Sequence, residues 1–171
     1  MDRMTENKTK KLVLVSLFIA LQVVLTRLTG IEITQNFRLA GTFLALAING
    51  ALLGPVTAGV SSMIADVIGF MLKPTGPFFP GFTITAGLSG FAYGFFLYKK
   101  EPNFKNIVKA TATVTFINNL LINSLWISML FHLPYIGQIK VRFLGEVGVF
   151  IIKTVVLTLV LPKILRALKR G

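Results

Sequence analysis

The chain has 171 residues, of which 54% are hydrophobic and only 14% are charged, and its mean hydropathy is +0.76. This composition excludes an ordinary soluble protein and predicts a chain whose solvent is largely lipid. Cysteine is absent, which excludes a disulfide framework, thiolate metal sites and a catalytic thiol. The net charge is +12, but lysine and arginine fall between apolar stretches rather than along one solvated face, so the charge favours a membrane protein over a nucleic-acid-binding protein.

Six apolar stretches follow one another along the chain, separated by segments rich in glycine and proline. A membrane-spanning helix needs about 20 mostly apolar residues, so each stretch is predicted to be a transmembrane helix. The stretches are residues 12–28, 39–53, 56–72, 82–98, 107–131 and 143–161. We therefore predict an all-α membrane protein with one transmembrane domain over residues 1–171.

The distribution of basic residues predicts the orientation, because lysine and arginine favour the cytoplasmic side of a membrane. With the N-terminus in the cytoplasm, the outer segments carry only Arg27, Arg38, Lys73, Lys140 and Arg142. The inner segments then carry Arg3, Lys8, Lys10, Lys11, Lys99, Lys100, Lys105, Lys109, Lys163, Arg166, Lys169 and Arg170. This asymmetry predicts that both termini are cytoplasmic.

Small residues at four-residue spacing allow helix backbones to approach closely in lipid. The second stretch has Gly50 and Gly54, and the fourth has Ala86, Gly90 and Gly94, which we interpret as internal packing seams. The first stretch has Ser16 and Ala20, which could equally serve internal packing or face a partner protein.

The segment KPTGPFFPGF, from Lys73 to Phe82, lies on the predicted outer face. Its three prolines and two glycines predict a loop with few conformations. Its rings, Phe78, Phe79 and Phe82, are expected to form a wall for a ligand or, alternatively, part of an interfacial aromatic belt.

The outer half of the fifth stretch contains Asn118, Asn119, Asn123, Ser124 and Trp126. Amides and an indole offer hydrogen bonds beside a flat apolar surface, which suits a planar heterocycle. Hydrogen bonding between helices is the alternative role of the amides.

The outer basic residues Arg27, Arg38 and Arg142 could bind an anionic ligand entering from outside, or could anchor the helices at the interface.

Asp66 and Lys153 are predicted to lie near the middle of the bilayer, where an isolated charge is costly. A structural ion pair between them is our main interpretation, and a proton or coupling-ion site is the alternative.

The chain contains no phosphate-binding loop and no familiar hydrolase or metalloprotease motif, so we expect no enzyme activity and no cofactor. Energy for transport would come from another chain or from an ion gradient.

The layout of six helices and the run ADVIGFMLKPTGPFFPGFTITAGLSGFAYGFFLYKK, residues 65–100, resemble the substrate-binding S component of energy-coupling factor (ECF) vitamin transporters. The resemblance is closest to the folate-specific type. It implies a subunit of a prokaryotic plasma membrane that captures a small-molecule vitamin from outside. The implied partners are a transmembrane coupling subunit (EcfT) and two EcfA-type ATPase subunits.

The resemblance also implies roles for individual residues. Ser16 and Ala20 match the face of the first helix that docks on the coupling subunit, and Val24 follows on this face where the family pattern has a third alanine. The vitamin would be bound by the outer ends of the helices and by the outer loop, at Arg27, Thr75, Gly76, Phe78, Phe79, Phe82, Asn119, Asn123, Trp126 and Arg142. Arg38 is a further candidate because it belongs to the outer basic residues.

The last helix departs from the folate-type pattern, because Arg142 is followed by Gly145 and Glu146. An acid at this position suits the dianionic glutamate tail of folate poorly. Another vitamin, such as a pyridoxine or a hydroxymethylpyrimidine, is therefore an alternative ligand. An autonomous ion-coupled carrier that uses Asp66 and Lys153 is a further alternative.

Overall fold

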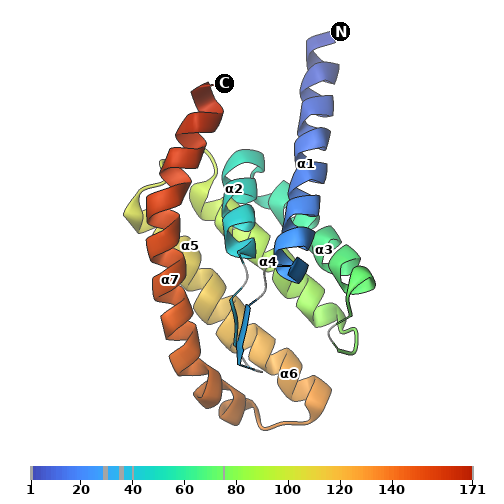
Figure 1. Cartoon of the computed structure of the whole chain (residues 1–171), viewed down its shortest axis with the longest axis vertical. Coiled ribbons are helices and arrows are strands. Elements are labelled where there is room, and N and C mark those ends of the chain that lie inside the picture. The colour runs from blue at the N-terminus through green and yellow to red at the C-terminus, as the bar shows by residue number, and fades with distance from the viewer. Residues whose placement is uncertain (1, 29–30, 35–36, 40, 75, 171) are drawn as a thin grey trace.

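The computed structural model describes residues 2–28, 31–34, 37–39, 41–74 and 76–170, with side chains over residues 8–26, 41–74 and 76–167. The elements in chain order are α1 (Asp2–Leu28), β1 (Ile31–Thr34), β2 (Phe37–Leu39), α2 (Thr42–Leu53), α3 (Pro55–Leu72), α4 (Pro80–Leu97), α5 (Phe104–Ala112), the π-helical η1 (Thr113–Ile122), α6 (Asn123–Phe131) and α7 (Tyr135–Arg170) (Figure 1). Since α5, η1 and α6 follow one another without a break, the described part of the chain forms six helices. The predicted all-α, six-helix membrane fold is confirmed.

Four of the helical segments are long and apolar enough to cross a membrane: Lys8–Thr26, Pro55–Leu72, Phe104–Phe131 and Tyr135–Ala167. Large apolar side chains on their outer surfaces are exposed, as in Leu12, Met71, Leu144 and Leu159. This pattern is typical of helices whose outer faces meet lipid. The start of α1 and the end of α7 lie at the same end of the bundle (Figure 1).

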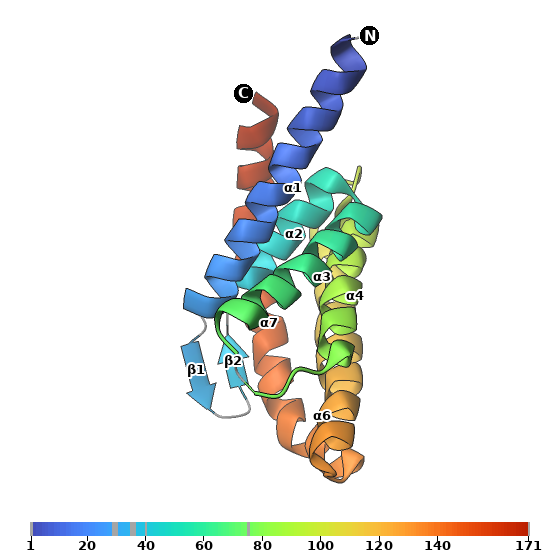
Figure 2. The same cartoon turned by 90° about the vertical axis from the view of Figure 1, so that its right-hand side faces the viewer.

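The segment between α1 and α2 contains a short antiparallel hairpin that the hydropathy pattern did not predict. Strands β1 and β2 pair so that Glu32 lies opposite Arg38. The hairpin lies at the end of the bundle that also carries α6 and the connection between α3 and α4 (Figure 2). Because β2 ends at Leu39, α2 begins at Thr42 rather than at residue 39.

The last helix is longer than predicted, since α7 runs from Tyr135 to Arg170 rather than over residues 143–161. Gln138, Lys140 and Arg142 continue the helix beyond the apolar stretch. Hydropathy detects only the apolar part of a helix, so polar turns at either end escape it.

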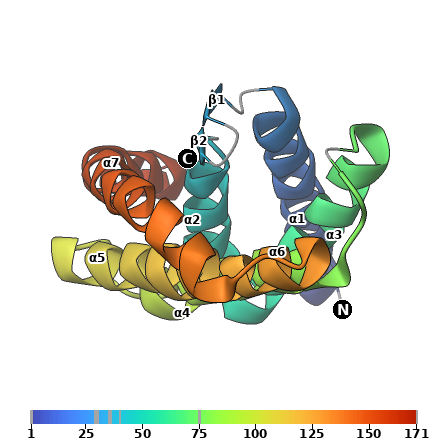
Figure 3. The same ribbon diagram turned by 90° about the horizontal axis from the view of Figure 1, so that it is seen from below.

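Helix α4 lies at the centre of the bundle. It contacts α2 and α3 on one side and α5, η1 and α6 on the other. Helix α1 packs on α2 and α3, whereas α7 packs on α2 and on the long helix from α5 to α6. Seen from below, α7 and α3 therefore lie on opposite sides of the bundle (Figure 3).

Glycines on α4 allow this central position, as the small-residue spacing predicted. A Cβ atom on Gly94 would overlap Pro55, and one on Gly90 would overlap the carbonyl oxygen of Ala58. On α2, a Cβ atom on Gly50 would lie 2.6 Å from the backbone nitrogen of Gly94. The predicted internal seams of the second and fourth helices are confirmed at these glycines.

A hydrophobic core fills the half of the bundle nearer the termini. Its fully buried members include Tyr93 and Leu97 on α4, Ile107 on α5, and Leu157 and Leu161 on α7. The opposite half is more polar, and it contains most of the candidate site residues.

Candidate functional site

An aromatic cluster of Phe79, Phe82 and Trp126 joins α4 to α6 at the hairpin end of the bundle. The ring centroids of Phe79 and Trp126 are 5.7 Å apart, and those of Phe79 and Phe82 are 5.9 Å apart with nearly perpendicular planes. Such edge-on arrangements are favourable for aromatic pairs. Gly81 allows the close approach, because a Cβ atom there would lie 2.5 Å from Phe79 Cε1 and 2.6 Å from Trp126 Cδ2.

A chain of hydrogen bonds fixes the orientation of this cluster. The Trp126 indole donates from Nε1 to Thr85 Oγ1 at 3.0 Å, and the Thr85 hydroxyl donates to the carbonyl oxygen of Gly81 at 3.0 Å. Thr85 is 3% exposed, so its hydroxyl is shielded from water and these bonds are not exchanged easily. The indole ring is therefore held in one position before any ligand binds.

The π-helical segment η1 presents two neighbouring amides to two different helices. Asn118 donates from Nδ2 to Ser89 Oγ on α4 at 3.1 Å, whereas the amide of Asn119 lies beside the Glu146 carboxylate on α7. π-Helical segments are rare and frequently occur at functional sites. Asn118 is thus a packing residue, and Asn119 faces the polar interior between η1 and α7.

A charged cluster on α7 faces this interior. Arg142 and Glu146 form an ion pair one helical turn apart at 3.4 Å, and Arg142 also donates to Ser124 Oγ at 3.3 Å. Their side chains are only 12% and 9% exposed. Lys153, two turns further along α7, also interacts electrostatically with Glu146.

Several buried polar atoms on η1, α6 and α7 have no hydrogen-bond partner within the described part of the chain. They are Thr115 Oγ1, Asn123 Oδ1, Glu146 Oε2 and Thr154 Oγ1. Buried polar groups are normally paired, so these atoms indicate a place where water or a ligand supplies the missing partners.

Some predicted site residues do not join either cluster. Thr75 and the side chains of Arg27 and Arg38 are outside the described residues. Gly76 is exposed, and a Cβ atom added to it would have no other atom within 4 Å. Phe78 packs on Phe70 of α3 with ring centroids 5.1 Å apart, so it does not join the cluster around Trp126.

The predicted ion pair between Asp66 and Lys153 is not formed. Asp66 on α3 accepts a hydrogen bond from Thr83 Oγ1 at 2.8 Å, and Lys153 on α7 faces Glu146 instead. Over the described ranges α3 and α7 make no contact. Similar depth in the membrane did not imply proximity, because the two helices lie on opposite sides of the bundle (Figure 3).

Asp66 lines a small polar pocket of about 200 Å³ between α1, α2, α3 and α4. Gln22 also lines it, and its buried Nε2 atom has no hydrogen-bond partner among the described residues. The pocket is therefore suited to water or to a small polar group.

Ser16, Ala20 and Val24 are all exposed on one face of α1. Their spacing of four residues places them one above another along the helix. Because their side chains are exposed, this face is available to lipid or to a partner protein.

Thr85 was not predicted to be a site residue, whereas Ser124 and Glu146 were noted in the sequence without being named as binding residues. Thr85 occupies an ordinary helical position, and no local signal marks a hydroxyl that an indole will contact. Glu146 had a signal, since it follows Arg142 by one helical turn, the spacing at which opposite charges pair.

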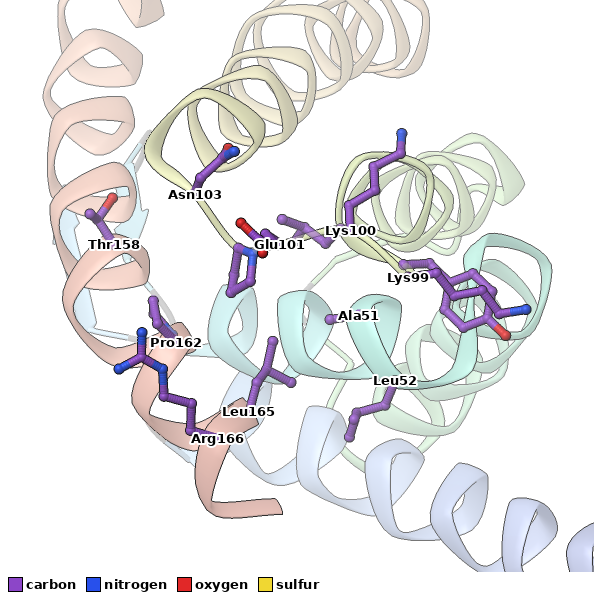
Figure 4. A pocket seen from close by; sticks show the side chains of 13 residues that line it. Ala51, Leu52, Lys99, Lys100, Glu101, Asn103, Thr158, Pro162, Leu165 and Arg166 are labelled. Carbon is purple, nitrogen blue, oxygen red and sulfur yellow. The ribbon is translucent and has the colours of Figure 1, made fainter. Parts of the chain in front are cut away.

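A larger pocket, of about 930 Å³, lies at the opposite end of the molecule (Figure 4). The ends of α2 and α4, residues 98–103 and the C-terminal part of α7 line it. Lys99 and Lys100 point away from it, whereas Glu101 and Asn103 lie at its edge (Figure 4).

In the described ranges no cluster of three or more His, Cys, Asp or Glu side chains is available to hold a metal ion.

Comparison with known proteins identifies the family. The model for the S component of the ECF-type riboflavin transporter matches residues 6–170. A folate transporter FolT from Clostridium novyi is 33% identical over 124 residues, which is 72% of each chain. A folate transporter FolT from Leuconostoc mesenteroides is 32% identical over 126 residues, which is 72% of this chain and 66% of that protein. A crystal structure of FolT bound with folic acid superposes with a TM-score of 0.80 and 34% identity, covering 88% of this chain and 90% of that one. The chain belongs to the family of ECF-type transporter S components, which are multi-pass membrane proteins.

Proposed function

We propose that this chain is the folate-binding S subunit of an ECF-type transporter in a prokaryotic plasma membrane. Two relatives at 32% and 33% identity carry the name folate transporter, and the structure bound with folic acid shares the fold over most of the chain. The fixed Trp126 ring, held by Thr85 and packed on Phe79, is the observation that carries the proposal. A rigid aromatic surface beside amides suits the planar ring system of a folate.

The binding site in this proposal combines aromatic and polar side chains at the outer end of the bundle. Phe79, Phe82 and Trp126 supply apolar contact, and Asn119, Asn123 and Arg142 supply hydrogen bonds. Arg27, Thr75 and Gly76 belong to the proposed site by the resemblance of their segments to the family, and Arg38 belongs to it as one of the outer basic residues. The basic side chains among them would attract the anionic glutamate tail.

The partners in this proposal follow from membership of the family. The chain would work with a transmembrane coupling subunit (EcfT) and two EcfA-type ATPases, which would supply the energy. Ser16, Ala20 and Val24 on the exposed face of α1 are the proposed docking residues. The excess of basic residues at the end that carries both termini supports a cytoplasmic location of that end.

Riboflavin is a second candidate ligand, because the matching family model carries that name. A pyridoxine or a hydroxymethylpyrimidine remains a third. An autonomous ion-coupled carrier based on Asp66 and Lys153 has lost its geometric support, since Asp66 bonds to Thr83 and lies away from Lys153.

The test is to purify the chain alone in detergent and to identify the small molecule that copurifies by mass spectrometry. The proposal predicts a folate, bound in a 1:1 ratio by a protein that hydrolyses no ATP. Copurified riboflavin with no affinity for folic acid would replace the proposal with the second candidate. Uptake into proteoliposomes that contain only this chain would support the autonomous carrier instead.

A further inference from the structure

Glu146 is the only acidic residue within the polar interior between η1 and α7 in the described part of the chain. Its carboxylate can accept hydrogen bonds from further donors. The residue is 7% exposed. The Asn119 amide and Lys153 lie beside the carboxylate, its Oε1 atom accepts one long bond of 3.4 Å from Arg142, and its buried Oε2 atom has no partner at normal hydrogen-bond geometry. A carboxylate has about four acceptor positions, so this one can still accept donors at Oε2.

Other buried polar atoms of η1, α6 and α7 also lack partners. Asn123 Oδ1, an acceptor, and the hydroxyls of Thr115 and Thr154 have no hydrogen-bond partner among the described residues. Leaving such a group unsatisfied is unfavourable. A ligand that brings N–H donors would remove this cost, whereas a ligand that brings carbonyl oxygens would face the carboxylate unfavourably.

We propose that Glu146 selects the 2-amino-4-oxo edge of the heterocycle, an inference that rests on the proposed binding of folate. On this edge the 2-amino group and the ring N3–H are adjacent donors, and they match the two oxygens of one carboxylate. A 2,4-dioxo ring, as in a flavin, offers an oxygen at the second position, which the carboxylate repels. Glu146 therefore contacts the ring system, and the glutamate tail lies elsewhere in the site.

The position of Glu146 along the bundle supports contact with the ring system rather than with the glutamate tail. It is 11 residues from the start of α7 at Tyr135, which at 1.5 Å per residue is about 17 Å below the outer end of that helix. Phe79 and Trp126 lie nearer the outer ends of their elements. A ring system that enters first would reach Glu146, while its charged tail stays near the outer surface.

The experiment compares folic acid with the analogue in which an oxygen replaces the 2-amino group, using titration calorimetry on the purified chain. We expect the unmodified protein to bind folic acid at least about tenfold more tightly than the 2-oxo analogue, since a site built for a donor rejects an acceptor. Equal affinities would overturn the inference without any need for a variant.

Glu146→Gln provides the second measurement, because a glutamine amide can donate to the 2-oxo group. Affinity for folic acid should fall by roughly 10- to 100-fold, and affinity for the 2-oxo analogue should be retained or increased. A merely structural role would weaken both ligands alike and leave their ratio unchanged, which would overturn the inference. Glu101→Gln, an exposed change at the opposite end, is the matched control and should alter neither affinity.

The two proposals fail in different ways. If the unmodified chain binds neither folic acid nor its analogue, the proposed function is wrong and this inference falls with it. If the chain binds folic acid but the ratio between the two ligands is unaffected by Glu146→Gln, only the role of Glu146 is wrong.

Discussion

The indole nitrogen of Trp126 on α6 lies 3.0 Å from the hydroxyl oxygen of Thr85 on α4, and the same hydroxyl donates to the carbonyl oxygen of Gly81. A single buried threonine therefore links the start of α4 to the aromatic ring that faces it. Trp126 is the only tryptophan in the chain, so the tryptophan fluorescence of the protein reports on this site.

Thr85→Val should loosen the ring. The substitution keeps the side-chain shape but removes the acceptor, and an unsatisfied buried N–H group costs roughly 1–3 kcal/mol. We expect a lower midpoint of thermal unfolding in detergent, a shifted Trp126 emission maximum and weaker vitamin binding. Thr85→Ser keeps the hydroxyl and should preserve the emission maximum, and identical spectra for all three proteins would show that the hydrogen bond is unimportant.

Gly81→Ala should displace the aromatic cluster. The new methyl group would lie 2.5 Å from Phe79 Cε1 and 2.6 Å from Trp126 Cδ2, so both rings would have to move. Overpacking of this kind costs about 1–3 kcal/mol, and we expect vitamin affinity to fall by about tenfold, measured by quenching of Trp126 fluorescence. The matched control is Gly148→Ala on α7, where no atom lies within 4 Å of the added methyl group. Equal affinities of the two variants would contradict a role for the cluster in binding.

The fold was largely predictable because hydropathy and length identify membrane helices directly. The hairpin of β1 and β2 was not, since strands of four and three residues have no periodic signal of their own. The π-helical geometry of η1 was likewise invisible, because the sequence TVTFINNLLI is compatible with an ordinary helix.

The site was predictable in its residue types and not in its contacts. Phe79, Phe82 and Trp126 were identified as aromatic candidates, and the structure brings them together, while Phe78 packs elsewhere. Depth along a helix can be counted from the sequence, but the direction in which a side chain points around the bundle cannot. This is why Lys153 was paired with Asp66 instead of with Glu146.

Gly94→Ala should destabilise the protein without altering the vitamin site. A methyl group on Gly94 would overlap Pro55 and would lie 2.8 Å from the carbonyl carbon of Gly54, and backbone atoms cannot rotate away. We expect a loss of about 1–3 kcal/mol in the free energy of unfolding. The seam is near the terminal end of the bundle, so the protein that remains folded should bind the vitamin with unchanged affinity. Stability equal to that of Gly148→Ala would show that α3 and α4 can separate easily.

Ala20→Trp should block assembly with the coupling subunit while leaving the vitamin site intact. Ala20 is exposed between Ser16 and Val24, and α1 packs on α2 and α3 rather than on the helices that carry Trp126 and Glu146. Close helix docking in lipid depends on small residues, so an indole at the centre of this face would hold a partner helix away.

The measurement for Ala20→Trp is copurification of a tagged coupling subunit and its ATPases, together with vitamin binding by the isolated chain. Ile151→Trp, on the exposed face of α7, is the control for a large ring in lipid and should assemble normally. If Ala20→Trp still assembles, the docking face lies elsewhere, and if it loses vitamin binding as well, the docking face and the binding site are not separate.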